Sequence, residues 1–127
     1  MKFHHIGYVV KDLNSAIEEW SKFGFSLASK TYVIAEQKVK VCFLQNYGDS
    51  HIELVQPDGE NTALTRYLKG KVKYYHLAYI SSEYSGKCNE FIENGAHLLS
   101  EFSSEAFAGK RCSFFLMPDS NLIEIIL

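Results

Sequence analysis

Two histidines and two glutamates recur in this sequence of 127 residues at one fixed spacing. His5 precedes Glu53 by 48 residues (53 − 5), and His76 precedes Glu124 by the same interval (124 − 76). All four lie in apolar segments with the composition of β-strands. Imidazole and carboxylate groups together suit a divalent transition-metal ion and can leave positions for water or a chelating substrate. The pattern therefore predicts a metal site built from both halves of the chain.

The neighbours of the two glutamates strengthen this prediction. Glu124 lies in the aliphatic run 122–127, and Glu53 lies between Ile52 and Leu54. An ionised carboxylate buried there without a partner costs several kcal/mol, a large share of the stability of a small domain. One cation shared by both carboxylates would compensate both charges. Hydrogen bonding within a sheet is the simpler interpretation of a single histidine on a strand, but recurrence of the pair favours a metal.

The rest of the chain repeats as well, with an offset of 71 residues. The matching pairs are Tyr8 and Tyr79, Glu19 and Glu90, Trp20 and Phe91, Gly24 and Gly95, and Phe43 and Phe114. A fixed period of this kind indicates two copies of one supersecondary unit.

Each copy is predicted to be a βαβββ unit, so we expect an α+β fold. The first copy has strands at 3–10, 25–34, 39–43 and 51–56 and a helix from Leu13 to Phe23, with Asp12 as N-cap and Gly24 as C-cap. The second has strands at 74–80, 98–102, 111–116 and 122–127 and a helix at 84–93. We expect one domain over 1–127, with module one at 1–57, a linker with a short helix at 58–72, and module two at 73–127.

Composition excludes several classes of function. The formal charge is −2 with a pI near 6.2, so no electrostatic footprint for nucleic acid or an anionic membrane is present. No apolar run approaches the ~20 residues of a membrane span, and no signal peptide is recognisable. The three cysteines are widely spaced and lack a C-x-x-C pair. We therefore expect a cytoplasmic protein with reduced thiols and a small-molecule substrate.

Four segments of the chain resemble the vicinal oxygen chelate superfamily, which includes glyoxalase I, methylmalonyl-CoA epimerase, extradiol dioxygenases and bleomycin-resistance proteins. These segments are 5–13, 51–57, 75–78 and 122–125. The resemblance implies that two βαβββ modules form a cupped mixed sheet. It also implies that His5, Glu53, His76 and Glu124 hold a divalent metal such as Co, Ni, Mn or Zn. In that superfamily the metal binds two neighbouring oxygens of the substrate and stabilises an oxyanion or enolate.

Within the superfamily the chain most resembles methylmalonyl-CoA epimerase. The run Glu36-Gln37-Lys38-Val39 matches a motif of that family whose glutamate is a catalytic base. This likeness makes Glu36 the candidate base and Glu124 the candidate second acid or base, while the ungapped repeat gives Phe107 as the counterpart of Glu36. The chain departs from the epimerases at Tyr75, Ala108 and Met117, where they usually carry histidine.

Several functions remain open at this stage. The resemblance favours epimerisation of an acyl-CoA, with a glyoxalase I-like lactoylglutathione lyase acting on the thiol adduct of a 2-oxoaldehyde as the alternative. A non-catalytic antibiotic-binding protein is a third reading, and its known examples generally lack the complete ligand set. We also expect a homodimer, because a cupped sheet leaves edges and a face open. His4 is expected to point to the strand face opposite His5.

Overall fold

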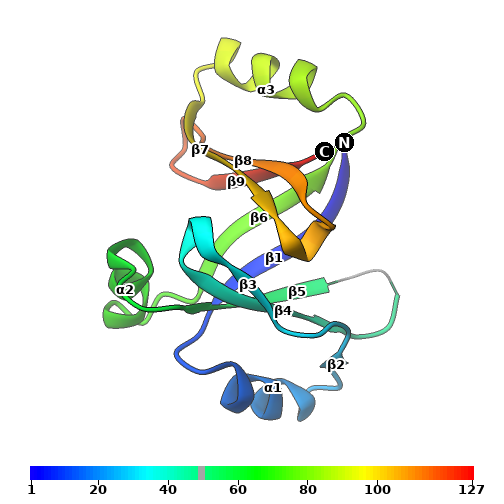
Figure 1. Ribbon diagram of the computed structural model, residues 1–127, viewed down its shortest axis with the longest axis vertical. Helices are drawn as coiled ribbons and strands as arrows, with labels where there is room; N and C mark the ends of the chain where they lie inside the picture. Colours follow the sequence, from blue (N-terminus) through cyan, green and yellow to red (C-terminus); the bar gives the residue numbers. More distant parts are fainter. Residues whose placement is uncertain (49–50) are drawn as a thin grey trace.

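The computed structural model describes residues 1–48 and 51–127, and within them the chain forms one nine-stranded sheet with three α-helices (Figure 1). The elements of the first half are β1 (Lys2–Val9), α1 (Leu13–Ser21), β2 (Ser26–Leu27), β3 (Tyr32–Ile34), the 3-10 turn η1 (Ala35–Gln37), β4 (Val39–Gln45) and β5 (His51–Pro57). Then come α2 (Thr62–Lys69), β6 (Tyr74–Ile80), α3 (Tyr84–Glu93), β7 (His97–Ser104), the 3-10 turn η2 (Glu105–Phe107), β8 (Lys110–Leu116) and β9 (Leu122–Ile126).

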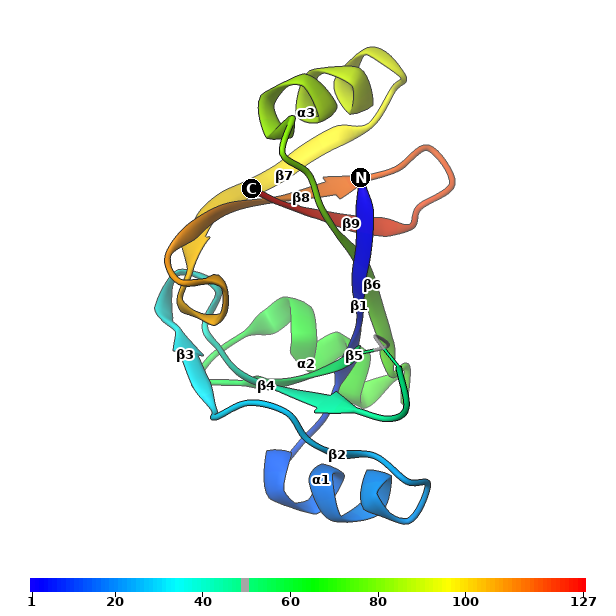
Figure 2. The same cartoon turned by 90° about the vertical axis from the view of Figure 1, so that its right-hand side faces the viewer.

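The sheet joins two like halves at its centre. Its strand order is β2-β4-β5-β1-β6-β9-β8-β7, with β3 paired to β4. In each half the first strand lies parallel to the last, β1 beside β5 and β6 beside β9, while β1 and β6 pair antiparallel. The sheet curls so that β3 approaches η2 from the other half, and α1 and α3 lie outside at opposite ends (Figure 2). The predicted α+β class and cupped mixed sheet are confirmed.

The first helix begins at its predicted cap but ends at Ser21, two residues before the predicted Phe23, with Lys22 and not Gly24 as its C-cap. Asp12 caps α1, because its carboxylate accepts the backbone N–H of Ser15 at 2.9 Å. Gly24 and Gly95 follow α1 and α3 with φ of +85° and +92°, a conformation that favours glycine. None of the helices in residues 1–48 and 51–127 has the length and apolar character needed to cross a membrane.

The single strand predicted at 25–34 is wrong: the chain forms two short strands there, β2 and β3. The interruption has a local cause. Ser29 accepts the N–H of Phe43 with its hydroxyl at 2.9 Å, so a side chain takes the place of a ladder carbonyl.

The repeat is also locally out of register. Both 3-10 turns are followed by a residue with positive φ, Lys38 at 52° and Ala108 at 54°, so the offset there is 70 residues (108 − 38). One extra residue before β8 restores the offset of 71. The structural counterpart of Glu36 is therefore Ala106, and the ungapped match to Phe107 is wrong.

The concave side of the sheet holds an apolar cluster drawn from both halves. Its buried members include Val9, Ile34, Val41, Val55, Phe102, Phe114 and Ile126. Burial of each such side chain contributes roughly 1.5–3 kcal/mol, so this cluster holds the two halves in a fixed relation. Cys42, Cys88 and Cys112 are free thiols, as the spacing predicts.

Candidate metal centre

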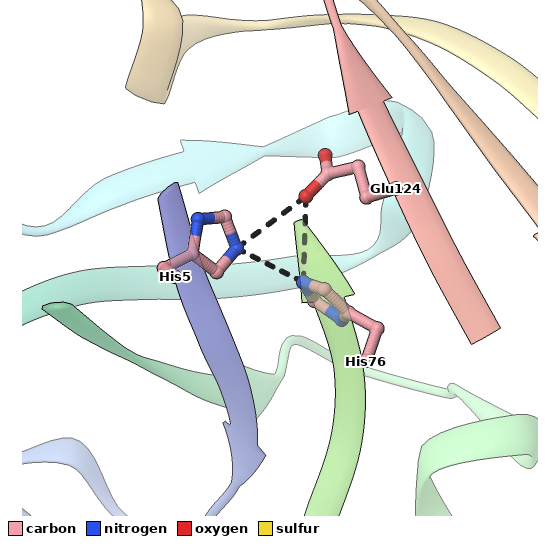
Figure 3. Close-up of side chains that lie close together, drawn as sticks. All are labelled: His5, His76 and Glu124. Atoms are coloured by element: carbon pink, nitrogen blue, oxygen red, sulfur yellow. Dashed lines mark hydrogen bonds and ion pairs between the residues drawn. The ribbon is translucent and has the colours of Figure 1, made fainter. Parts of the chain in front are cut away.

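The four predicted ligands converge on the concave side of the sheet. His5 (β1), Glu53 (β5), His76 (β6) and Glu124 (β9) lie on four strands that are consecutive in the sheet order β5-β1-β6-β9. Their exposed fractions are 0%, 5%, 1% and 3%. Figure 3 shows His5, His76 and Glu124 pointing toward one another. Residues up to 119 positions apart in the chain (124 − 5) thus share one buried point.

The ligand atoms are spaced as an ion requires. The His5 and His76 Nε2 atoms are 3.0 Å apart, and Glu124 Oε2 lies 3.4 Å and 3.3 Å from them. Glu53 Oε1 is 3.6 Å from both nitrogens. Around an ion with bonds of about 2.1 Å, neighbouring ligands lie about 3.0 Å apart in an octahedron and about 3.4 Å apart in a tetrahedron. His5, His76 and Glu124 therefore offer three ligand atoms close enough together to hold one divalent ion, and Glu53 lies beside this group without belonging to it.

The charges in the cluster are unbalanced without a cation. Burial alone would lower the pKa of His5, but the Glu53 and Glu124 carboxylates outweigh it and raise the pKa to about 9. Burial would raise the pKa of Glu124, yet hydrogen bonds from His5 and His76 hold it below its ordinary value. Two buried carboxylates carry a formal charge of −2, which a divalent ion neutralises while leaving both imidazoles neutral.

A glycine makes room for one of the ligands. Gly7 lies opposite His76 across the β1–β6 ladder, and a Cβ built on Gly7 would come within 2.3 Å of the His76 ring. The corresponding residue in the second half, Ala78, lies opposite His5 and is fully buried. The two imidazoles thus pack over different residues although their strands are equivalent.

Two β-bulges bring further side chains to the centre. The β1–β6 ladder pairs Phe3 with Tyr79 and His5 with Ala78, which leaves His4 unpaired, and it skips Tyr75 in the same way. The extra residue of a bulge interrupts the alternation of side chains along the strand, so its side chain can point to the same face of the sheet as that of the next residue. The expectation that His4 points away from His5 is therefore wrong.

His4 hydrogen-bonds to a ligand, which sequence reasoning missed. Its Nδ1 lies 2.8 Å from Nδ1 of His5, and its ring stacks on His51 at 5.4 Å. Burial and the neighbouring His5 and His51 lower the pKa of His4 to about 4, so it is neutral at pH 7. The adjacent histidines were visible in the sequence, but strict strand alternation assigned them to opposite faces.

Two hollows flank the four ligands. A small cavity of about 20 Å³, enough for about one water, is lined by Glu53, His76, Glu124, Gln37, Tyr75, Ser104 and apolar side chains. A second, of about 160 Å³, is lined by His4, Phe43, His51, Phe107 and their neighbours. Gln37 and Phe107 are equivalent residues of η1 and η2, so the two hollows occupy corresponding positions in the two halves. The first combines three of the candidate ligands with an apolar wall, and the second is bordered by two histidines and two phenylalanines.

The candidate base lies outside the cavity. Glu36 is exposed on η1, and it does not line the small cavity, whereas the next residue, Gln37, does. The expected burial of Glu36 in the cup is not observed. Its catalytic role stays a prediction.

The chain is similar to known proteins over most of its length. Residues 4–114 match the family model described as the Glyoxalase/Bleomycin resistance protein/Dioxygenase superfamily. The chain belongs to this superfamily. The match covers the first βαβββ unit and the second as far as Phe114 in β8, and it includes three of the four candidate ligands, since Glu124 lies beyond its end. No curated protein matches the chain.

Solved structures with the same fold include several epimerases. A methylmalonyl-CoA epimerase from Mycobacterium tuberculosis is 24% identical, with a TM-score of 0.82 over 98% of this chain and 86% of that one. A methylmalonyl-CoA epimerase variant from Streptomyces coelicolor, in complex with 2-nitronate-propionyl-CoA, is 23% identical, with a TM-score of 0.80 over 99% and 93%. A hypothetical protein from Bacillus halodurans C-125 is 23% identical, with a TM-score of 0.81 over 98% and 92%. At these identities the likeness shows a shared fold.

Proposed function

We propose that the chain is a metal-dependent enzyme that removes a proton from the carbon next to a carbonyl group, and that it epimerises an acyl-CoA thioester. The observation that carries this proposal is the convergence of His5, Glu53, His76 and Glu124 at ligand spacing in a buried cup. The choice of acyl-CoA is supported by the Glu36-Gln37 motif and by the fold shared with methylmalonyl-CoA epimerases.

The four ligands would hold a divalent ion such as Co²⁺, Ni²⁺, Mn²⁺ or Zn²⁺, which supplies a Lewis acid for two neighbouring oxygens of the substrate. The chain itself contributes the surroundings. Val41, Val55 and Phe114 form part of the apolar wall of the small cavity. Electrostatic interactions beside such a wall are stronger than in bulk water.

Two carboxylates are assigned to proton transfer. Glu36 removes the proton on one face of the substrate carbon, and Glu124, which is also a ligand, exchanges it on the other. Because Glu36 is exposed in this structure, it reaches the substrate by a change of its rotamer or of η1. In the direction in which Glu36 is the base, Glu124 starts protonated and delivers its proton to the opposite face; in the reverse direction the two carboxylates exchange these roles.

The proposal is tested by exchange of the α-proton of methylmalonyl-CoA in D₂O, followed by NMR with protein loaded with Co²⁺. The wild type should exchange the proton and interconvert the epimers. Glu36→Gln should lower the rate by more than about 100-fold with the metal still bound. Glu105→Gln is the matched control, since Glu105 is an exposed carboxylate on the equivalent turn η2. Equal rates for Glu36→Gln and wild type would remove Glu36 as the base.

A glyoxalase I-like lyase is the second candidate, and the exposure of Glu36 favours it. In that case the base is a carboxylate already beside the imidazoles, Glu53 or Glu124. Turnover of the glutathione adduct of methylglyoxal, without exchange of the acyl-CoA proton, would support this function. Protein that binds no stoichiometric metal and sequesters a drug would instead support the antibiotic-binding class.

We further propose that the protein acts as a cytoplasmic homodimer. The three free thiols suit a reducing compartment. The edges and outer face of the sheet favour self-association. Sedimentation equilibrium of the purified protein measures the mass directly, and a monomer at micromolar concentration would contradict the proposed dimer.

A further inference from the structure

The two candidate histidine ligands differ in what holds the ring nitrogen that faces away from the centre. Both present Nε2 to the carboxylates. Nδ1 of His5 lies 2.8 Å from Nδ1 of His4. Nδ1 of His76 is buried and has no hydrogen-bond partner among residues 1–48 and 51–127. The residue equivalent to His4 beside His76 is Tyr75, whose ring contacts the imidazole edge-on at 4.7 Å.

The role of His5 as a candidate ligand decides which of the two Nδ1 atoms carries the proton in the His4–His5 hydrogen bond. A ligand nitrogen must offer its lone pair, so a neutral His5 that coordinates through Nε2 carries its proton on Nδ1. His5 Nδ1–H is then the donor, and His4 Nδ1 is the acceptor. A nitrogen that accepts this hydrogen bond carries no proton, so the ring proton of His4 is on Nε2.

The His4 ring is held on several sides. It stacks on His51 with ring planes 22° apart, and it meets Phe43 and Phe107 edge-on at 5.8 Å and 5.3 Å. The β-bulge at residue 4 aims the side chain at this position. An acceptor held this firmly restricts the rotation of the ring that donates to it.

We propose that His4 is a positioning residue of the metal centre, whose Nδ1 accepts the Nδ1–H of His5 and thereby fixes the tautomer and orientation of that ligand. The proposal rests on the proposed metal centre but not on the reaction. Partners that hold the second nitrogen of a ligating histidine typically change metal affinity by about 10–100-fold. Nδ1 of His76 makes no such hydrogen bond to Tyr75 or to any other residue that the structure describes, so the two imidazoles are held unequally.

The first test compares Zn²⁺ affinity among variants by competition with a chromophoric chelator. His4→Phe keeps a ring but removes the acceptor, and it should weaken binding by about 10–100-fold. His4→Asn should retain most of the affinity, because the Asn oxygen is the same number of bonds from the backbone as Nδ1 of histidine. Tyr75→Phe is the matched control at the equivalent bulge and should bind Zn²⁺ as the wild type does.

The second test reads the hydrogen bond itself. In ¹⁵N-labelled, Zn²⁺-loaded wild type, a scalar coupling across the hydrogen bond should connect Nδ1 of His5 with Nδ1 of His4. A role of His4 in packing alone would not produce this coupling. Its absence in the loaded protein overturns the proposal even if His4→Phe does not fold.

The outcomes distinguish a failure of the proposed metal centre from a failure of the proposed role of His4. Wild type that binds less than one Zn²⁺ per chain contradicts the metal centre, and the role of His4 falls with it. Wild type that binds one Zn²⁺, with His4→Phe binding equally well, contradicts only the role of His4. Loss of affinity in His4→Phe with recovery in His4→Asn, together with the coupling, supports it.

Discussion

The two halves of the molecule share a backbone but not a set of contacts. Each contributes one histidine and one glutamate from equivalent strands, and each has a bulge before its histidine. In the first half the bulge residue is His4, which bonds to His5, whereas in the second half it is Tyr75, which leaves Nδ1 of His76 without a partner in the described residues. The duplicated scaffold thus brings the ligands together, and unmatched residues make the two sides of the centre chemically different.

The turns that border the two hollows differ in the same way. Gln37 on η1 lines the small cavity with Ser104, whereas Phe107 on η2 stacks over His5 at 6.0 Å with ring planes 11° apart. The surroundings of the candidate ligands therefore differ between the two halves.

The largest effect is expected from removal of a ligand. His76→Ala should reduce affinity for Co²⁺ or Zn²⁺ by more than about 100-fold, because a ligand contributes more than a residue that only orients one. His97→Ala is the control, since His97 is an exposed histidine of the same half. Metal content after dialysis, measured by mass spectrometry, checks the result. Equal metal in wild type and His76→Ala would show that the cluster is not the metal site.

The next effect tests the difference between Gly7 and Ala78. Gly7→Ala places a methyl group against the His76 ring and should cost about 1–3 kcal/mol of unfolding free energy, together with most of the metal affinity. Ala78→Gly, at the equivalent position, should cost only about 0.5–1 kcal/mol. Chemical denaturation measures both. Similar losses for the two variants would mean that the halves accommodate their histidines alike.

The third effect is the dependence of metal affinity on pH. Since the pKa of His5 is raised to about 9 without metal, an ion must displace a proton from it below that pH. Affinity should therefore rise about tenfold per pH unit between roughly pH 6.5 and 9 and then level off. Calorimetry in buffers of different ionisation enthalpy counts the protons released. Binding at pH 7.5 without proton release would contradict the raised pKa.

The same shift has a consequence for the metal-free protein. A raised pKa contributes stability that is fully present below the unfolded value near 6.5 and is lost as pH rises through about 9. Melting temperature of the metal-free protein should therefore fall over this interval. The metal-loaded protein, in which His5 is already neutral, should not show this loss.

The smallest effect compares the outer helices. Asp12 caps α1 through Ser15, whereas Glu83 at the start of α3 makes no side-chain capping bond. Asp12→Ala should lower the melting temperature by about 2–6 °C, and Glu83→Ala should change it little. Both should leave metal affinity unchanged, because α1 and α3 lie outside the cup. Loss of metal in Asp12→Ala would show that α1 influences the centre.

Much of the fold could be predicted because it depends on local patterns. Alternating strands, the Asp12 cap and the glycines after both helices are short-range signals, and the 71-residue repeat relates one half to the other. The split between β2 and β3 could not be predicted, because it depends on Ser29 reaching a backbone group on β4. The one-residue shift at Glu36 does not show in an ungapped comparison of the two halves. The offset is 70 residues at the two 3-10 turns and returns to 71 at β4 and β8, only a few residues later.

The sequence by itself was enough to predict four candidate ligands, because an ionised Glu53 or Glu124 buried among aliphatic residues calls for a compensating group and the repeat supplies two imidazoles. Only the tertiary structure decided which further side chains meet those ligands. The pairing of β1 with β6 creates the bulges that turn His4 and Tyr75 inward, and the curl of the sheet brings Phe107 over His5. Such contacts depend on strand register and curvature, which arise from long-range packing.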